Sequence, residues 1–202
     1  MTDGCNPSHC ECQRCDAVGM ASIQTLSGAD RRCVARWAVA CAEHVIHLFE
    51  ADDAAEAEIR DAIVRTHAYS RGEGRAAEEI GKRLIAGRAA KAATTPSGSA
   101  AARSVAQAAA VAHMGAHALG AAAYAVKAVS LAEGPERAQG EIRWQLAQLS
   151  DSERDALATL PALGSDRSGP LGDGLLSRGI LGDSIRAIQA DLTSRDGGGS
   201  RG

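Results

Sequence analysis

The stretch that decides the fold is AAARSVAQAAAVAHMGAHALGAAAYAVKAVSL, residues 100–131. Alanine, which has the highest helix propensity, dominates it. Its few long polar side chains are Arg103, Gln107 and Lys127. Because nearly every face is small or apolar, we expect this helical region at the centre of the molecule, where small residues let helix backbones approach closely. Gly115 and Gly120 indicate a bend, a break or a tight helix crossing within it.

Amphipathic helices are predicted around this central region. Apolar residues at i, i+3, i+4 and i+7 predict a core-facing helix from Val34, with Asp30 as its N-cap. Other predicted helices cover residues 53–70 and 75–93 and segments that begin at Gly134 and at Ser150, the first residue of a capping box. Aromatic residues make up only 2% of the chain, and no segment alternates apolar with polar in a sustained way. The sequence therefore predicts an all-α, alanine-rich multi-helix bundle.

Composition divides the 202 residues into three parts. Residues 1–29 form an arm rich in cysteine and histidine, residues 30–160 the helical domain, and residues 161–202 a flexible tail rich in glycine. Within the tail, apolar residues at positions 181, 185, 188 and 192 predict a short amphipathic helix that docks on the body.

Charge and hydropathy exclude several classes of partner. A net charge of −3 provides no basic stripe for nucleic acid. The apolar runs near residues 108–126 are interrupted by His113, His117 and Lys127, so no membrane span is expected. The N-terminus lacks the basic and apolar regions of a secretory signal, and we therefore expect a cytoplasmic protein.

The arm contains the clearest candidate metal site. Its possible ligands are Cys5, His9, Cys10, Cys12 and Cys15, and the Cys-x2-Cys spacing at its end is usual for zinc. The two later cysteines, Cys33 and Cys41, lie on one predicted helix roughly 12 Å apart, too far to share an ion. A self-contained zinc site in the arm and an arm with incidental thiols both remain open.

Two histidine pairs raise a further possibility. His113 and His117 share one helix face at a spacing that metal sites use, and His44 and His47 could add ligands from another helix. No carboxylate accompanies the first pair, so histidines hydrogen-bonded between helices are the favoured interpretation over a helical metalloenzyme. No nucleophile or phosphate-loop motif is present, and we expect no enzymatic activity. The acidic run at residues 50–61 is either a solvated face or a contact surface for a basic partner.

Four blocks of sequence carry a family resemblance. They are RWAVACAEHVIHLFE (36–50), AYSRGE (68–73), AHMGAHALGAAAYAVKA (112–128) and RWQ (143–145). In this order and spacing they resemble the helical "putative immunity protein" family of bacterial polymorphic toxin systems. The resemblance implies a cytoplasmic all-α protein that binds a cognate toxin and blocks it. The positions that match the family pattern are Trp37, Cys41, Glu43, Phe49, Arg71, Gly72, Glu73, His113, His117, Gly120, Tyr124, Lys127 and Trp144.

These matches and the acidic run together give the candidate partner-binding residues. They are Trp37, Glu43, Asp52, Asp53, His113, His117, Tyr124 and Lys127. The chain departs from the family pattern in its cysteine-rich arm, in Tyr69 and in its glycine-rich tail. These departures keep open an alternative function, a zinc- or redox-responsive helical module regulated by the N-terminal cysteines.

Overall fold

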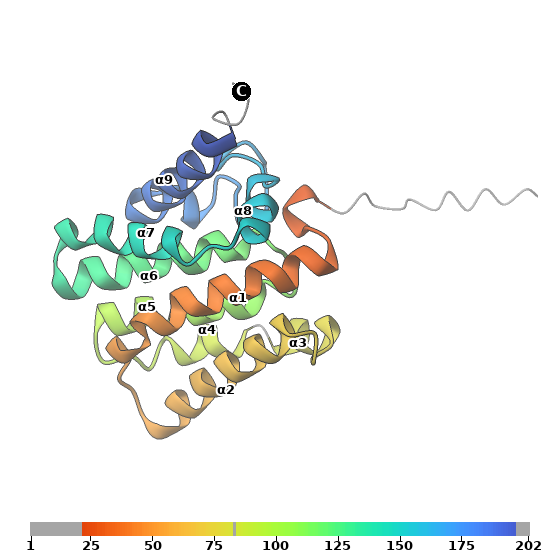
Figure 1. Ribbon diagram of the computed structural model, residues 1–202. Helices are drawn as coiled ribbons and strands as arrows, with labels where there is room; N and C mark the ends of the chain where they lie inside the picture. Colours follow the sequence, from red (N-terminus) through yellow and green to blue (C-terminus); the bar gives the residue numbers. More distant parts are fainter. Residues whose placement is uncertain (1–21, 83, 197–202) are drawn as a thin grey trace, which may run out of the picture.

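A computed structural model describes residues 22–82 and 84–196. Its helices pack into one bundle, which confirms the all-α prediction (Figure 1). The α-helices are α1 (Gly28–Val45), α2 (Asp53–Ser70), α3 (Ala76–Lys82), α4 (Ile85–Ala89), α5 (Pro96–Ala110), α6 (His117–Glu133), α7 (Ala138–Ala147), α8 (Asp151–Ala158) and α9 (Gly179–Asp196). Short 3-10 turns span Ile23–Thr25, Ile46–Leu48, Pro135–Arg137 and Leu175–Ser177.

Helix α6 is the centre of the bundle. It packs against α1, α5, α7 and α9, with α9 on one side and α1 and α5 on the other (Figure 1). Alanine at most of its positions allows this close approach, since no large side chain holds the neighbouring backbones apart. The buried Ser104 hydroxyl of α5 donates a 2.7 Å hydrogen bond to the Ala121 carbonyl oxygen of α6. The sequence prediction of a central, tightly packed region is therefore confirmed.

The central region is two helices, because the chain turns between α5 and α6. The amide of Gly115 donates to the Thr25 carbonyl oxygen at 3.0 Å, and the amide of Ala116 donates to that of Gln24 at 3.0 Å. A Cβ atom on Gly115 would lie 2.6 Å from Cγ of Leu26. Glycine at this position therefore lets the N-terminal segment close over the turn.

The packed body extends beyond residues 30–160 at both ends. The Gln24 side chain is buried, and its amide nitrogen donates to Asp166 Oδ2 at 2.6 Å and to the Ser168 carbonyl oxygen at 2.8 Å. Its carbonyl oxygen accepts from the Leu171 amide at 3.0 Å. These three bonds join the first described residues to the segment before α9. The predicted flexible tail is packed through α9, whose residues Leu181, Ile185, Ile188 and Leu192 are buried as the periodicity predicts.

Two predicted boundaries differ from the structure. Helix α1 begins at Gly28 and its N-cap is Ser27, whose hydroxyl accepts from the Asp30 amide, so Asp30 lies inside the first turn. The helix predicted over 75–93 is two short helices, α3 and α4. Gly81 and Gly87, one within each of these helices, lower the helix propensity of the segment.

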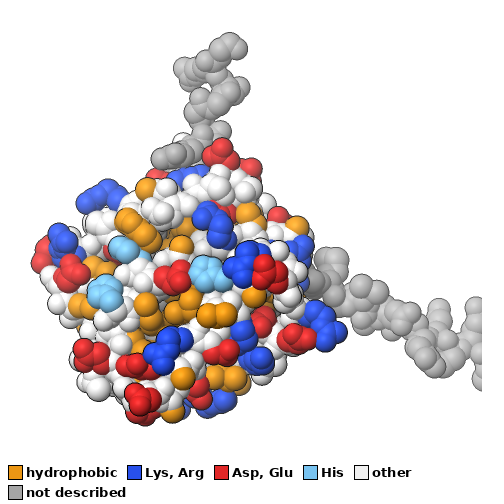
Figure 2. Space-filling model, turned by 60° about the horizontal axis from the view of Figure 1, so that its bottom comes forward, with side chains coloured by type: hydrophobic (Ala, Val, Ile, Leu, Met, Phe, Trp, Pro, Cys, Tyr) orange, Lys and Arg blue, Asp and Glu red, His pale blue; other side chains and the backbone are white. Residues whose placement is uncertain are grey.

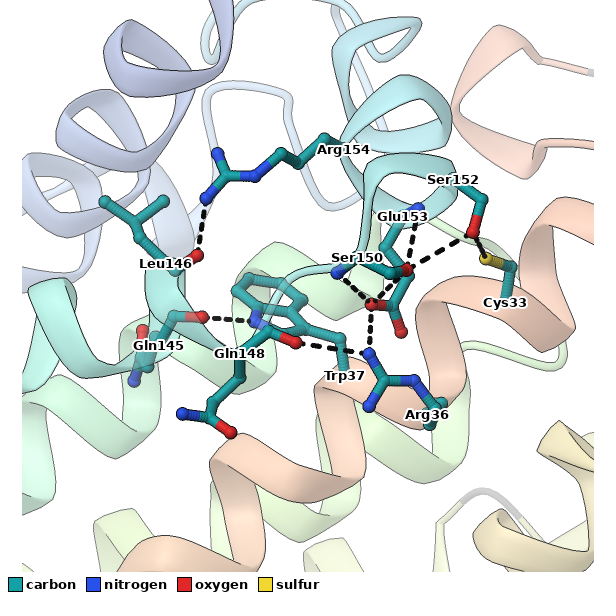
Figure 3. Close-up of polar contacts among 10 residues, drawn as sticks. All are labelled: Cys33, Arg36, Trp37, Gln145, Leu146, Gln148, Ser150, Ser152, Glu153 and Arg154. Atoms are coloured by element: carbon teal, nitrogen blue, oxygen red, sulfur yellow. Dashed lines mark hydrogen bonds and ion pairs between the residues drawn. The ribbon is translucent and has the colours of Figure 1, made fainter.

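A set of polar contacts fixes α7 and α8 against α1 (Figure 3). The indole nitrogen of Trp37 donates to the Gln145 carbonyl oxygen at 2.8 Å. The buried carboxylate of Glu153 accepts from Ser150 in the predicted capping box and from the guanidinium of Arg36. Because α7 is fixed in this way, its outer face presents side chains in a defined position.

Candidate functional site

A cleft lies where the end of α1 meets α6 and α7. We call it the tryptophan cleft, and its volume is about 410 Å³. Its lining residues are His44, His47, Val129, Glu133, Glu136, Arg137, Gly140, Glu141, Arg143 and Trp144.

An aromatic pair stands in this cleft. The rings of His44 and Trp144 are stacked, with centroids 3.6 Å apart and planes 8° from parallel. Nδ1 of His44 lies 2.8 Å from Oε2 of Glu141, a buried carboxylate one turn earlier on α7 than Trp144. The carboxylate fixes the imidazole and the imidazole fixes the indole, so the Trp144 ring is held in position before any partner binds.

The carboxylate of Glu141 is itself held from the core side. The Gln145 amide nitrogen donates to Glu141 Oε1 at 2.8 Å and to the Ala122 carbonyl oxygen of α6 at 3.1 Å. Trp37 donates to the backbone of the same glutamine. A continuous polar chain therefore runs from the interior of α1 to the exposed rim of the cleft.

A second, smaller cavity lies between α4, α5 and the start of α6. We call it the arginine cavity; its volume is about 240 Å³. It is lined by Leu84, Gly87, Arg103, Ala106, Gln107, Ala110, His113, His117 and Tyr124. The described residues of its lining include no aspartate or glutamate, in contrast to the tryptophan cleft.

Glycine at position 120 shapes one wall of the arginine cavity. Nδ1 of His117 is 2.7 Å from Oε1 of Gln107. A Cβ atom on Gly120 would lie 3.0 Å from the Gln107 side-chain carbon and 3.1 Å from Leu176. Only a residue without a side chain lets the histidine and glutamine meet over this part of α6, which is the tight crossing that the sequence predicts.

The four histidines of the metalloenzyme hypothesis do not come together. His44 and His47 line the tryptophan cleft, whereas His113 and His117 line the arginine cavity. Among residues 22–82 and 84–196, no group of three or more His, Cys, Asp or Glu residues could hold a metal ion. That hypothesis is wrong for these residues. The favoured alternative holds for His117, which pairs with Gln107 across two helices.

The predicted zinc ligands cannot be placed. Cys5, His9, Cys10, Cys12 and Cys15 all lie outside the described residues.

The matched family positions divide into core and surface residues. Trp37, Cys41 and Phe49 are buried, so they pack the core and do not form a contact surface. Burial raises the pKa of the Cys41 thiol well above its ordinary value, and the nearby carboxylates of Glu141 and Glu153 raise it further. These residues support the helices that carry the two cavities.

The turn after α2 contains another matched block. Arg71 and Glu73 form an exposed pair, with two nitrogen–oxygen distances of 2.8 and 2.7 Å. The hydrogen bond from Arg71 lowers the pKa of the Glu73 carboxyl. The turn therefore carries an exposed charged pair.

The remaining candidate contact residues are dispersed. Glu43 is exposed and pairs with His67 at 2.9 Å, and Lys127 is half-buried on α6. Asp52 caps α2 by accepting from the Ala55 amide at 2.8 Å, while Asp53 is exposed in the first turn. None of these four lines either cavity, and only His113, His117 and Tyr124 from the candidate set do.

The acidic run is partly neutralised within its own helix. Glu56 pairs with Arg60 at 3.1 Å, and Asp61 pairs with Arg65 at 2.7 Å. Figure 2 shows a face on which acidic and basic side chains are interspersed in the same manner. Glu50, Asp52, Asp53 and Glu58 form no ion pair with a described residue, so the run as a whole stays acidic.

Sequence reasoning did not identify Glu141, Gln145 or Arg103 as site residues. Glu141 and Gln145 are buried polar residues one turn apart. Both lie within two turns of Trp144 on one helix, and this spacing could have indicated that the three residues belong to one site. Arg103 stands out as a long polar side chain in the alanine-rich stretch, but nothing in the sequence places it beside a cavity.

No helix in the described segments combines the length and apolar character that crossing a bilayer requires. No curated protein and no solved structure matches the chain. A family model described as "Imm-5 like putative immunity protein" matches residues 24–152, more than half of the chain and the part that builds both cavities. The chain belongs to this Imm-5-like immunity protein family.

Proposed function

We propose that this protein binds a toxin protein and neutralises it by direct contact, without catalysis, in the cytoplasm. The observation that carries the proposal is the family match over residues 24–152. Proteins that act by occlusion need a preformed surface, and a bundle joined by buried hydrogen bonds supplies one at little cost in conformational entropy on binding.

The tryptophan cleft is the part of that surface best suited to a protein partner. Tryptophan and arginine are the residues most often found at binding hot spots, and Trp144 and Arg143 both line this cleft. The stack on His44 and the bond from His44 to Glu141 hold the indole in position. A partner side chain that enters the cleft therefore meets an ordered aromatic wall.

Charges around the cleft favour a partner of mixed polarity. Glu133 pairs with Arg137 at 3.1 Å, and Glu136 and Arg143 also line the cleft. Groups of both signs at a rim contribute to specificity and orientation more than to affinity. The exposed acidic residue Asp53, on α2, remains a candidate for a further contact with a basic part of the toxin.

Growth of bacteria tests the proposal. The product of the gene adjacent to that of this protein, taken as the toxin under test, is expressed alone, with the parent chain, and with the variants Trp144→Ala and Val64→Ala. We expect the parent and Val64→Ala to restore growth, because Val64 is an exposed residue of α2 outside the cleft. Loss of a central tryptophan contact costs about 2 kcal/mol or more, so Trp144→Ala should restore growth poorly.

The outcomes separate the function from its location. If the toxin kills equally with and without the parent protein, the proposed function is wrong. If the parent protects and Trp144→Ala protects equally well, only the assignment to the tryptophan cleft is wrong. Thermal unfolding of each purified variant shows whether loss of protection reflects loss of fold.

A further inference from the structure

The arginine cavity has a lining rich in hydrogen-bond donors. Arg103 supplies a permanent positive charge, and none of the described residues that line the cavity is a carboxylate that could neutralise it. The Arg103 side chain makes no hydrogen bond or ion pair with any residue of the described segments. The other surface arginines around the bundle commonly do, as Arg60, Arg71 and Arg137 show. The guanidinium is therefore available to a ligand.

A tyrosine hydroxyl adjoins the same cavity. Tyr124 is only 4% exposed, yet it lines the cavity and its hydroxyl has no hydrogen-bond partner among the residues that the structure describes. The hydroxyl oxygen keeps exposed surface, so a ligand that enters the cavity can reach it. A ligand oxygen in the cavity would satisfy this donor.

Two further features add to the donor character. Gln107 uses its carbonyl oxygen with His117, and this orients its amide nitrogen as a donor. His117 is also the first residue of α6, so the positive end of that helix dipole adjoins the cavity. A negatively charged group in this cavity is therefore favoured by Arg103, Tyr124, Gln107 and the N-terminus of α6.

The size of the cavity limits what can enter. Its volume of about 240 Å³ is below the roughly 300–1,000 Å³ of typical ligand pockets, so a group the size of one side chain fits and a cofactor does not. Leu84, Ala106 and Ala110 give part of the lining an apolar character. This combination suits a short aliphatic stem that ends in an anion.

We propose that the arginine cavity is a binding site for a carboxylate, which Arg103 pairs with and the Tyr124 hydroxyl hydrogen-bonds. A planar guanidinium binds a planar carboxylate through two parallel bonds, which fixes the orientation of the bound group. Gly120 is part of the site because a side chain there would displace Gln107. The site is separate from the tryptophan cleft and does not depend on the proposed contact with a toxin.

Nuclear magnetic resonance of the ¹⁵N-labelled full chain tests the site, with acetate as the probe and ionic strength kept constant with sodium chloride. We expect saturable shifts of the Gly120 and Tyr124 amide signals. Arg103→Met should raise the Kd for acetate by about tenfold or more, the usual effect of losing a charge-assisted hydrogen bond. Arg143→Met removes an arginine of the tryptophan cleft and should leave the Kd unchanged.

Tyr124→Phe provides a second variant that removes only the hydroxyl. Because that hydroxyl bonds to no described residue, the fold should be unchanged while acetate binds several-fold more weakly. Absence of saturable shifts in the parent overturns the proposal. Equal acetate affinity in the parent, Arg103→Met and Tyr124→Phe overturns it as well.

The source of the carboxylate is distinguished with capped amino acids. N-acetyl-glutamate N-methylamide that binds more tightly than acetate identifies a site for an acidic side chain of a protein. Acetate that binds equally or more tightly identifies a site for a free small carboxylate. Both results support the site, whereas equal binding of the capped glutamine would overturn it because no negative charge would then be recognised.

Discussion

The indole nitrogen of Trp37 donates a 2.8 Å hydrogen bond to the backbone oxygen of Gln145, and the tryptophan has no exposed surface. Through this bond the interior of α1 holds α7, which carries the tryptophan cleft. The Gln145 oxygen also accepts from the Gln148 amide, so it keeps one partner if the indole is removed.

Two substitutions of Trp37 should therefore destabilise the protein by different amounts. Trp37→Phe should lower the free energy of unfolding by about 1–2 kcal/mol, for one lost hydrogen bond and a small loss of volume. Trp37→Ala should lower it by about 3–5 kcal/mol. Urea denaturation measures both, with the half-buried Trp144→Phe as the control. A Trp37→Phe variant as stable as the parent would show that the bond contributes nothing.

Two glycine substitutions should have opposite effects. Gly115→Ala would place a Cβ atom 2.6 Å from Cγ of Leu26, and overpacking of this kind costs about 1–3 kcal/mol. Gly81→Ala in α3 meets no atom within 4 Å and should stabilise the protein by about 0.5–1 kcal/mol through helix propensity. Thermal unfolding of the two variants checks this, and stabilisation by both would contradict the close approach at the α5–α6 turn.

Helix periodicity predicts most of the fold. The stripe from Val34, the capping box at Ser150 and the apolar positions of α9 all correspond to buried or capping residues in the structure. Each of these patterns lies within a single helix, so the sequence of that helix alone is enough to predict it. The turn that separates α5 from α6 is not local, because it depends on carbonyl groups of Thr25 and Gln24 that lie about ninety residues earlier.

The sites depend on contacts between distant elements in the same way. Family resemblance predicts His117 and Tyr124 as site residues, yet it gives no reason for their proximity to Arg103. The stack of His44 on Trp144 joins residues a hundred positions apart, and no pattern in the sequence predicts this contact. Each cavity forms between three packed helices. Sequence patterns could therefore predict some of its lining residues, but not the cavity itself.

Zinc binding by the N-terminal cysteines remains a prediction, and metal analysis of the full chain purified without chelator tests it. A zinc site in the arm predicts about one zinc per chain, lost in the double variant Cys12→Ser and Cys15→Ser, whereas incidental thiols predict substoichiometric zinc in both proteins. Cys33→Ser should retain the metal, since Cys33 lies on α1. Substoichiometric zinc in the parent, or equal loss in Cys33→Ser, would contradict the prediction.

The buried thiol of Cys41 should be unreactive in the folded protein. Burial, together with Glu141 and Glu153, raises its pKa well above 9.0, so little thiolate is present at pH 8. Peptide mapping after iodoacetamide treatment should show little modification of Cys41 in the native chain and full modification in urea. Cys33, which is only half-buried, serves as the internal comparison and should react faster. Rapid native modification of Cys41 would contradict its burial.

The same raised pKa has a consequence for stability at high pH. Above about pH 9 the unfolded chain releases the Cys41 proton while the folded chain keeps it, so the unfolded state is favoured as pH rises. Below that pH the thiol is protonated in both states and contributes no pH dependence. The free energy of unfolding should therefore fall as the pH rises above about 9 in the parent, and less steeply in Cys41→Ala. Equal slopes for the two proteins would show that the thiol ionises as readily in the fold as in the open chain.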